Sequence, residues 1–239
     1  MEATLSKGLF NQFKQGVLGG ISIAIGYLPI AITYGLIARS TGLSLTETVL
    51  MSVIVYAGAS QYIALDMIGK QIGMMEIVFT TFIVNIRHLL MSASLNEKVE
   101  KDSGLKRAIY SFGITDETFS VASVQKSMLT TGYMFGLTFI AYFSWVLFSA
   151  VGYIVGANLP TVFQDGMSVA LYAMFIGLLV PSLKGNMKVL FLAGTAAIFN
   201  SVFTLCQVLS TGWSIVVSTL ISAILVELVS WMKGGHLHD

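Results

Sequence analysis

Two long stretches of the chain carry almost no charge. Between Lys126 and Lys184 the only charged residue is Asp165, and between Lys188 and Glu227 there is none. A transmembrane helix needs about 20 consecutive apolar residues, so these stretches have room for four. The whole chain has 10% charged residues, against about 25% in a soluble domain, and shows none of the alternation typical of a transmembrane barrel. The sequence therefore predicts an all-α, polytopic transmembrane protein.

Seven strongly apolar segments account for most of the 239 residues. We expect one transporter domain over 1–239, with a short interfacial segment at 1–14, a polar cytoplasmic loop at 96–107 and a cytoplasmic tail at 233–239. A weaker, amphipathic piece covers 108–125. The seven segments are 15–38, 43–68, 72–95, 130–155, 167–183, 187–209 and 212–232.

The positions of Lys and Arg conflict with plain crossings in the first half. Lys7 and Lys14 favour a cytoplasmic N-terminus, and the four positive charges of 96–107 favour a cytoplasmic loop. Three full crossings between them would place that loop outside. Either one early segment does not cross fully, or 108–125 crosses and the charge rule is overridden. Because positive charge flanks 108–125 on both sides, a re-entrant or broken element there would resolve the conflict.

Two early segments contain residues that can interrupt a helix. Pro29, which follows Gly26, lacks a backbone donor, and Gly58, Ser60 and Gln61 interrupt VYAGASQYIAL. Such residues often serve helix packing in membranes. Because they recur at similar depth in adjacent segments, we favour a substrate site where broken helices meet. In the second half, Gly177 followed by Pro181 resembles the first pattern, and an inverted repeat is a further hypothesis.

The stretch FIVNIRHLLMSASL places Asn85, Arg87 and His88 inside a segment suited to lipid. One interpretation is that Arg87 reaches back to the headgroups and His88 follows it. The other is that the three side chains line an internal cavity, since a charge near the bilayer centre costs at least ~2.5–3.5 kcal/mol. We favour the second, because Arg87 lies about 12 Å from the segment's end at 1.5 Å per residue.

Asp116 and Glu117 are the obvious carboxylates for these basic groups. Either both face cytoplasmic water, or one of them pairs with Arg87 or His88 inside the protein. An unperturbed histidine titrates near neutral pH, and a buried carboxylate can be protonated there. His88, Asp116 and Glu117 are therefore candidates for proton or charge coupling.

Several function classes lack their usual sequence features. The net charge of +1 gives no reason to expect nucleic-acid binding, and a single cysteine excludes cysteine-clustered metal sites. There is no GxxxxGK[ST] phosphate loop, no HExxH and no G-x-S-x-G elbow. We therefore expect no catalytic residues, no metal site and no cofactor, and a protein that is not an enzyme.

Four blocks in fixed order resemble the AzlC family of bacterial branched-chain amino acid permeases. The GASQ and N-x-RH-x-LMS-x-S motifs within them are the most specific. The blocks are GYLPIAITYGLIARSTGLSLTETVLMSVIVYAGASQYIAL (26–65), TTFIVNIRHLLMSASL (80–95), GITDETFSV (113–121) and MFIGLLVPSL (174–183).

The resemblance implies export of branched-chain amino acids of the L-valine class, with methionine as a further substrate, across the bacterial cytoplasmic membrane. It also implies a small hydrophobic partner subunit of the AzlD or YgaH type. We expect a secondary mechanism, with the substrate between Pro29, Gly58–Gln61 and the Asn85/Arg87/His88 face. A channel-like pore for a small solute and a scaffold subunit of a transport complex are the alternatives.

Overall fold

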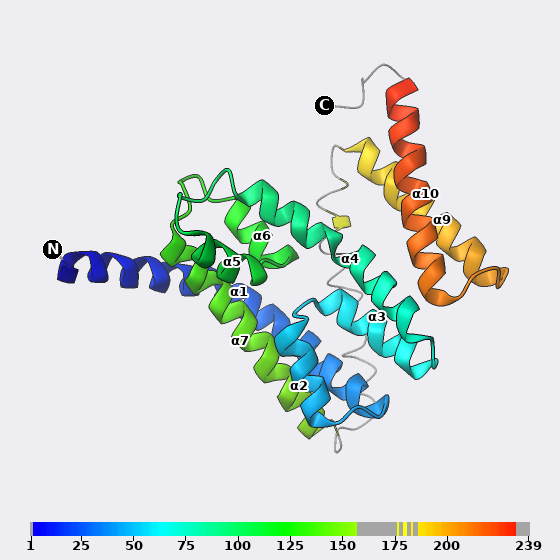
Figure 1. Cartoon of the computed structure of the whole chain (residues 1–239), viewed down its shortest axis with the longest axis horizontal. Helices are drawn as coiled ribbons and strands as arrows, with labels where there is room; N and C mark the ends of the chain where they lie inside the picture. The colour runs from blue at the N-terminus through cyan, green and yellow to red at the C-terminus, as the bar shows by residue number, and fades with distance from the viewer. Residues whose placement is uncertain (1, 157–175, 177–178, 181–182, 184–185, 233–239) are drawn as a thin grey trace. The chain divides into compact units, whose positions relative to one another are not determined.

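The computed structural model describes residues 2–156, 176, 179–180, 183 and 186–232, and these are predominantly helical (Figure 1). The helices are α1 (Glu2–Ser40), α2 (Leu45–Ile54), α3 (Gly58–Gly69), α4 (Met74–Leu95), α5 (Gly104–Phe112), α6 (Asp116–Ser123), α7 (Thr131–Val155), α9 (Met187–Leu205) and α10 (Thr211–Met232).

Five of these helices are long and apolar enough to cross a bilayer, namely α1, α4, α7, α9 and α10. This confirms the prediction of a polytopic helical membrane protein. The tail at 233–239 lies outside the described residues, as do Gly177 and Pro181 and most of the segment 167–183. The inverted repeat therefore stays a hypothesis.

The described residues form two compact units. Those within 1–65 and 85–170 belong to unit 1, and those within 66–84 and 171–239 belong to unit 2. The α4 helix contributes its first part to unit 2 and its second part to unit 1. A single transporter domain over 1–239 stays a prediction.

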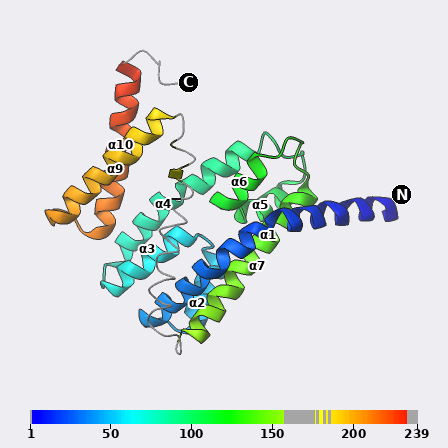
Figure 2. The same cartoon turned by 180° about the vertical axis from the view of Figure 1, so that it is seen from behind.

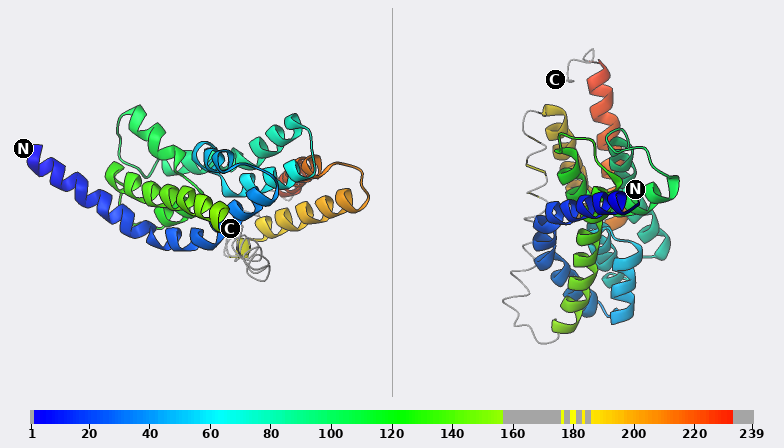
Figure 3. Two further views of the ribbon diagram at one scale, coloured as in Figure 1. Left: turned by 90° about the horizontal axis from the view of Figure 1, so that it is seen from below. Right: turned by 90° about the vertical axis from the view of Figure 1, so that its left-hand side faces the viewer.

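The core of unit 1 is the pair α1 and α7, which lie side by side (Figures 1 and 2). Gly16 of α1 lies against Gly136 of α7 at one close approach, and Gly35 against Gly152 at the other. A Cβ on any of the four would overlap backbone atoms of the opposite helix. Because both residue numbers increase together, the two helices run parallel, and small residues are what permit backbones to approach so closely in membranes. Figure 3 shows this pair from two further directions.

The α1 helix is continuous from Glu2 to Ser40, so the break that we expected at Pro29 is wrong. No helix boundary lies near residue 14 either. Proline costs one backbone hydrogen bond, which membrane helices tolerate where neighbouring groups compensate. Thr33 Oγ1 donates to the Pro29 carbonyl (2.8 Å), and the Tyr62 hydroxyl donates to the Ile30 carbonyl (2.6 Å), so side chains bond this stretch of α1, although neither bond replaces the one that Pro29 cannot donate to the Ile25 carbonyl.

The segment 43–68 is broken as predicted, between α2 and α3. A capping box of Ser44 and Glu47 begins α2, and Tyr56, with φ of 42°, turns the chain before α3 begins at Gly58. The α2 residue Thr48 accepts a bond from Tyr34, and Gly58 lies against Trp145, whose ring contacts Tyr27 of α1.

After the turn at Tyr56, α3 runs back toward the end of unit 1 from which α2 entered. Tyr62 reaches the Ile30 carbonyl and packs its ring against Tyr34. The segment 43–68 thus enters unit 1 from the C-terminal end of α1 and turns near Tyr27. The geometry favours the alternative in which one early segment does not cross fully.

The piece 108–125 belongs to a second broken pair of helices, α5 and α6. This pair enters unit 1 from the N-terminal end of α7, opposite to the end from which α2 and α3 enter. Tyr110 of α5 packs on Phe135, near the start of α7. The chain turns at Gly113–Thr115, where the Thr115 hydroxyl bonds Tyr27 (2.8 Å). It then returns, and Gln125 donates to the Tyr133 hydroxyl (3.1 Å). Thr115 caps α6, and a Cβ at Gly113 would overlap Thr138.

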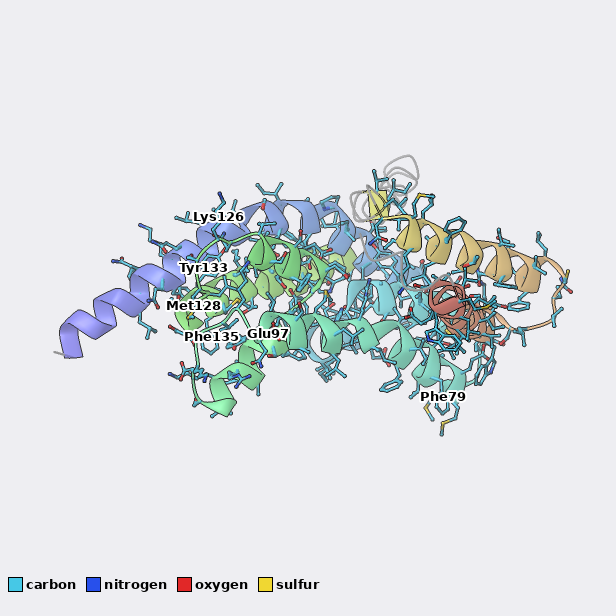
Figure 4. All side chains as sticks on the ribbon, turned by 90° about the horizontal axis from the view of Figure 1, so that it is seen from above. Phe79, Glu97, Lys126, Met128, Tyr133 and Phe135 are labelled. Atoms are coloured by element: carbon cyan, nitrogen blue, oxygen red, sulfur yellow. The ribbon has the colours of Figure 1, made fainter. Side chains whose placement is uncertain are left out.

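The loop 96–107 is held at the N-terminal end of α7. Lys98 donates to the Ser123 carbonyl, and Glu100 accepts from the Thr131 N–H (2.6 Å). Figure 4 shows Glu97, Lys126 and Met128 gathered near this end. Since the loop's four positive charges and Lys126 all lie here, the positive-inside rule favours the cytoplasm for this end of unit 1, and the cytoplasmic loop stays a prediction. A parallel α1 then also begins in the cytoplasm, which removes the conflict found in the sequence.

In unit 2, α9 and α10 run antiparallel, and the α9 residue Lys188 pairs with Glu227 of α10 (2.6 Å). Glu76, in the first turn of α4, caps the start of α10. Its carboxylate accepts from the N–H groups of Gly212 (3.1 Å) and Trp213 (3.2 Å) and from the Ser210 hydroxyl. Negative charge at a helix N-terminus is stabilising, and no local sequence pattern around Glu76 indicates this role.

We expect Glu76→Ala to destabilise the protein by about 1.5–3 kcal/mol, the range for hydrogen bonds to a charged group. The measurement is thermal unfolding of the purified protein in detergent, with Glu97→Ala as the control because Glu97 is exposed. Equal melting temperatures for the two variants would show that this cap contributes nothing.

Candidate functional site

The tips of the two broken helix pairs meet inside unit 1. Tyr56, at the α2–α3 turn, packs on Phe112, the last residue of α5 (ring centroids 6.1 Å). Tyr27 of α1 lies between the α2–α3 and α5–α6 turns. Its ring packs on Trp145 (ring centroids 5.1 Å), which contacts Gly58 of the first turn, and its hydroxyl bonds Thr115 of the second. Tyr27, Tyr56 and Trp145 are each less than 5% exposed. We call this region, together with the second half of α4, the central site.

Arg87 of α4 pairs with Asp116 at the start of α6, through Nη1 and Oδ2 at 2.9 Å. Both side chains are partly buried, at 35% and 24% exposure. Of the two alternatives that the sequence left open for Asp116 and Glu117, the structure has the internal pair. The Nε of Arg87 is buried and has no hydrogen-bond partner among the described residues. The guanidinium therefore has one unsatisfied donor, which a second carboxylate can reach once the atoms that cover it move.

The α4 helix separates an apolar face from this polar one. Phe82, Ile86 and Leu89, spaced four and three residues apart, are exposed. Arg87 is half-buried on another side of the helix, and Asn85, three residues from Phe82 and four from Leu89, is half-buried at the border of the apolar face. Because the exposed face is wholly apolar, it suits lipid, and the charged group is turned toward the protein.

Glu117 is held by α1, since the Tyr27 hydroxyl donates to its Oε2 at 2.6 Å. The same hydroxyl contacts Thr115, so one tyrosine joins α1 to the α5–α6 turn. His88 is half-buried and follows Arg87 on α4, and it bonds no other described side chain. A coupling role for His88, Asp116 and Glu117 stays a prediction.

Two residues of the GASQ motif, Ser60 and Gln61, form buried hydrogen bonds with side chains of neighbouring helices. Ser60 donates to Asn85 Oδ1 (2.6 Å) and thereby joins α3 to α4. Gln61 accepts from Trp145 Nε1 (3.0 Å) and donates to Ser52 (3.1 Å), which donates to Ser149 (2.9 Å). Ser60 and Gln61 have no exposed surface. In this conformation the network positions α3 and Asn85.

The predicted site residues therefore separate into two groups. Asn85 and Arg87 lie at the central site with Asp116 and Glu117. Gly58 supports the site by packing on Trp145, and Ser60 and Gln61 support it through hydrogen bonds. Pro29 lies two residues beyond Tyr27 on α1, and direct contact of any of these residues with substrate stays a prediction.

Sequence reasoning missed the aromatic part of the site, because it assigned aromatic residues to lipid or packing. Tyr27, Tyr56 and Trp145 converge only through the turns of α2–α3 and α5–α6. The single available signal was Ser149, which follows Trp145 by four residues and so places a polar residue on the same face of α7. Among the described residues, no group of three or more His, Cys, Asp or Glu side chains could hold a metal ion.

A comparison with protein families matches residues 22–159 to the family described as "AzlC protein". The chain belongs to the AzlC family. The matched region contains the whole central site, from Tyr27 to Trp145, so the residues described above lie within the family's common part.

Three relatives of this AzlC protein are similar over most of their length. The "Inner membrane protein YgaZ" of Escherichia coli is 30% identical, over 72% of this chain and 74% of its own. The "Branched-chain amino acid transport protein AzlC" of Bacillus subtilis is 29% identical, over 70% and 66%. An "Uncharacterized membrane protein" of Archaeoglobus fulgidus is 30% identical, over 73% and 77%. No solved structure matches the chain significantly. Together with the five spans, these names identify a multi-pass membrane protein.

Proposed function

We propose that this protein exports branched-chain amino acids of the L-valine class, with methionine as a further substrate, across the bacterial cytoplasmic membrane. Support comes from the similarity to the branched-chain amino acid transport protein of Bacillus subtilis and to the inner membrane protein of Escherichia coli. The observation that carries the proposal is the Arg87–Asp116 pair, which lies at the meeting of two broken helix pairs and leaves Arg87 Nε free.

An amino acid is a zwitterion, and an ion pair is its natural counterpart. The substrate carboxylate would bind Arg87 through Nε and an Nη, since guanidinium groups bind carboxylates in a bidentate manner. Asp116 would then accept the ammonium group. The Arg87–Asp116 pair is thus replaced by two pairs, one between Arg87 and the substrate carboxylate and one between Asp116 and the ammonium group. No buried charge is left without a partner, which would be costly.

Other parts of the site have supporting roles in this proposal. The aliphatic side chain of the substrate would pack on aromatic surface such as that of Tyr56 and Trp145. Asn85, held by Ser60, would fix the orientation of the backbone groups. His88, Asp116 and Glu117 are the groups that could take up a proton in a secondary mechanism. A small AzlD-type partner would be required for full activity in the membrane.

Flux of radiolabelled L-valine into proteoliposomes tests this function. We expect uptake that is saturable and stimulated by unlabelled valine on the opposite side. An imposed pH gradient tells whether protons are coupled, and co-reconstitution with the partner tells whether it is needed. A pore would show no stimulation from the opposite side. Absence of flux for this chain, with its partner supplied as well, would contradict the proposal.

A further inference from the structure

A separate cavity of about 360 Å³ lies between the end of α4 and α5. Its size is within the range of small-molecule sites. The residues important here are Ser92, Asn96, Arg107, Ser111 and Ile114. All of them belong to unit 1, at the end that carries the positive loop. The positive-inside rule therefore makes this a cytoplasmic cavity.

The cavity continues the polar face of α4 beyond the central site. Asn85, His88, Ser92 and Asn96 follow one another at intervals of three, four and four residues. That spacing places them along one side of the helix, and the last two line the cavity. At its inner end lies Ile114, which is 1% exposed and immediately precedes Thr115 of the central site. The row of polar side chains thus leads from the cavity to Asn85 of the central site.

The α5 helix presents opposite faces to lipid and cavity. Leu105, Ile109 and Phe112, at intervals of four and three residues, are at least 50% exposed. Arg107 and Ser111 line the cavity. A helix with this pattern lies with its apolar face in the membrane and its polar face toward a hydrated space.

Arg107 is the cation that lines the cavity, where its guanidinium interacts with the Tyr110 hydroxyl and keeps further donors for an anion. Its neighbour Lys106 is taken by Asp102 (2.9 Å), and this contact holds the pKa of the Asp102 carboxyl below its usual range. Arg107 is half-buried and forms no ion pair with a described carboxylate. Its surroundings are otherwise mainly apolar, which suits a small aliphatic molecule that carries a carboxylate.

We propose that this cavity is the cytoplasmic entry chamber for the transported amino acid, where Arg107 receives the carboxylate before the molecule moves to Arg87 and Asp116. The inference rests on the proposed function and adds to it a second subsite and a selectivity residue. Ser92 and Asn96 would hydrogen-bond the amino and carboxyl groups as the molecule passes along α4.

Cysteine labelling tests the chamber directly. Cys206 is the single cysteine of the chain and is exposed, so a Cys206→Ser background allows Ser111→Cys and Ser92→Cys to be labelled alone. In inside-out vesicles with a membrane-impermeant maleimide, both should be labelled, and L-valine should slow labelling severalfold. Met128→Cys, exposed at the same end, should label at the same rate with and without valine. No labelling at both cavity positions, or labelling that valine does not slow, would overturn the proposal.

Transport kinetics test Arg107 separately. Arg107→Gln should raise the cytoplasmic KM for valine roughly tenfold with little change in kcat, as expected for loss of one charged contact. Arg107→Lys should restore part of the loss. Lys101→Gln removes an exposed charge from the same loop and should leave KM unchanged. An unchanged KM in Arg107→Gln overturns the assignment of this residue.

Two further outcomes keep the inference distinct from the proposed function. If the wild type carries no valine in either direction, then the function itself has failed. If it carries valine, and labelling at Ser111→Cys is blocked by anionic lipid in the vesicles and not by valine, then the cavity is a headgroup site and the chamber proposal is wrong.

Discussion

Arg87→Ala is expected to abolish valine export in practice. Truncating one member of a partly buried, hydrogen-bonded charge pair at a binding site costs about 2–5 kcal/mol, which corresponds to a loss in kcat/KM of about 30-fold to more than 1,000-fold. Here the loss would combine the missing carboxylate contact with an Asp116 left without its partner. The measurement is initial valine flux in proteoliposomes at matched protein content.

A charge swap separates binding from folding. The double variant Arg87→Asp with Asp116→Arg keeps an ion pair between α4 and α6, so its thermal stability should exceed that of Arg87→Ala. Its transport should stay low, because the substrate's two charges would meet their receptors in reversed order. Lys70→Ala is the control, since its pair with Asp66 is exposed and such pairs contribute little. Wild-type flux in Arg87→Ala would contradict the central site.

Gly35→Ala is expected to cause the largest loss of stability. An added Cβ would overlap the backbone of α7 at Ser149, which cannot move aside as a flexible side chain would. Overpacking by one carbon typically costs 1–3 kcal/mol, and overlap with backbone should reach about 3 kcal/mol or more. Gly152→Ala should cause a similar loss of stability, because its Cβ would overlap the backbone of α1 at Ile32. Yield of monodisperse protein and its melting temperature provide the measurement.

Gly26→Ala is the matched control on the same helix. Nothing lies within 4 Å of a Cβ there, and alanine in a helix is favoured over glycine by about 0.5–1 kcal/mol. The two substitutions should therefore change stability in opposite directions. If Gly35→Ala were as stable as Gly26→Ala, then α1 and α7 would not pack as described.

Local sequence signals predicted local structure well. The capping box of Ser44 and Glu47 and the break before Gly58 follow from chemistry within a few residues, and both are present. The expectation of a break at Pro29 was wrong for a related reason. A proline removes one hydrogen bond, but whether the helix breaks depends on tertiary contacts, such as the bond from Tyr62 to the Ile30 carbonyl, which a linear pattern does not place.

The central site shows the same limit. A deep arginine needs a partner, so the sequence could propose Asp116 for Arg87 from charge alone. Tyr27, Tyr56 and Trp145 carry no such requirement, because an aromatic residue in an apolar segment suits lipid as well as a buried site. Their convergence depends on two broken helix pairs that enter from opposite ends. Glu76 was missed similarly, since its partners lie more than 130 positions away.

The most direct test of the account is equilibrium binding of 3-methylbutanoate, which is valine without its amino group, to wild type and to Asp116→Asn. If a substrate carboxylate binds Arg87 in place of Asp116, then removing the aspartate charge vacates the guanidinium for a lone carboxylate. We predict that 3-methylbutanoate binds Asp116→Asn markedly more tightly than wild type, whereas valine binds more weakly. Equal binding of 3-methylbutanoate to both proteins would contradict the exchange of ion pairs on which the proposed function depends.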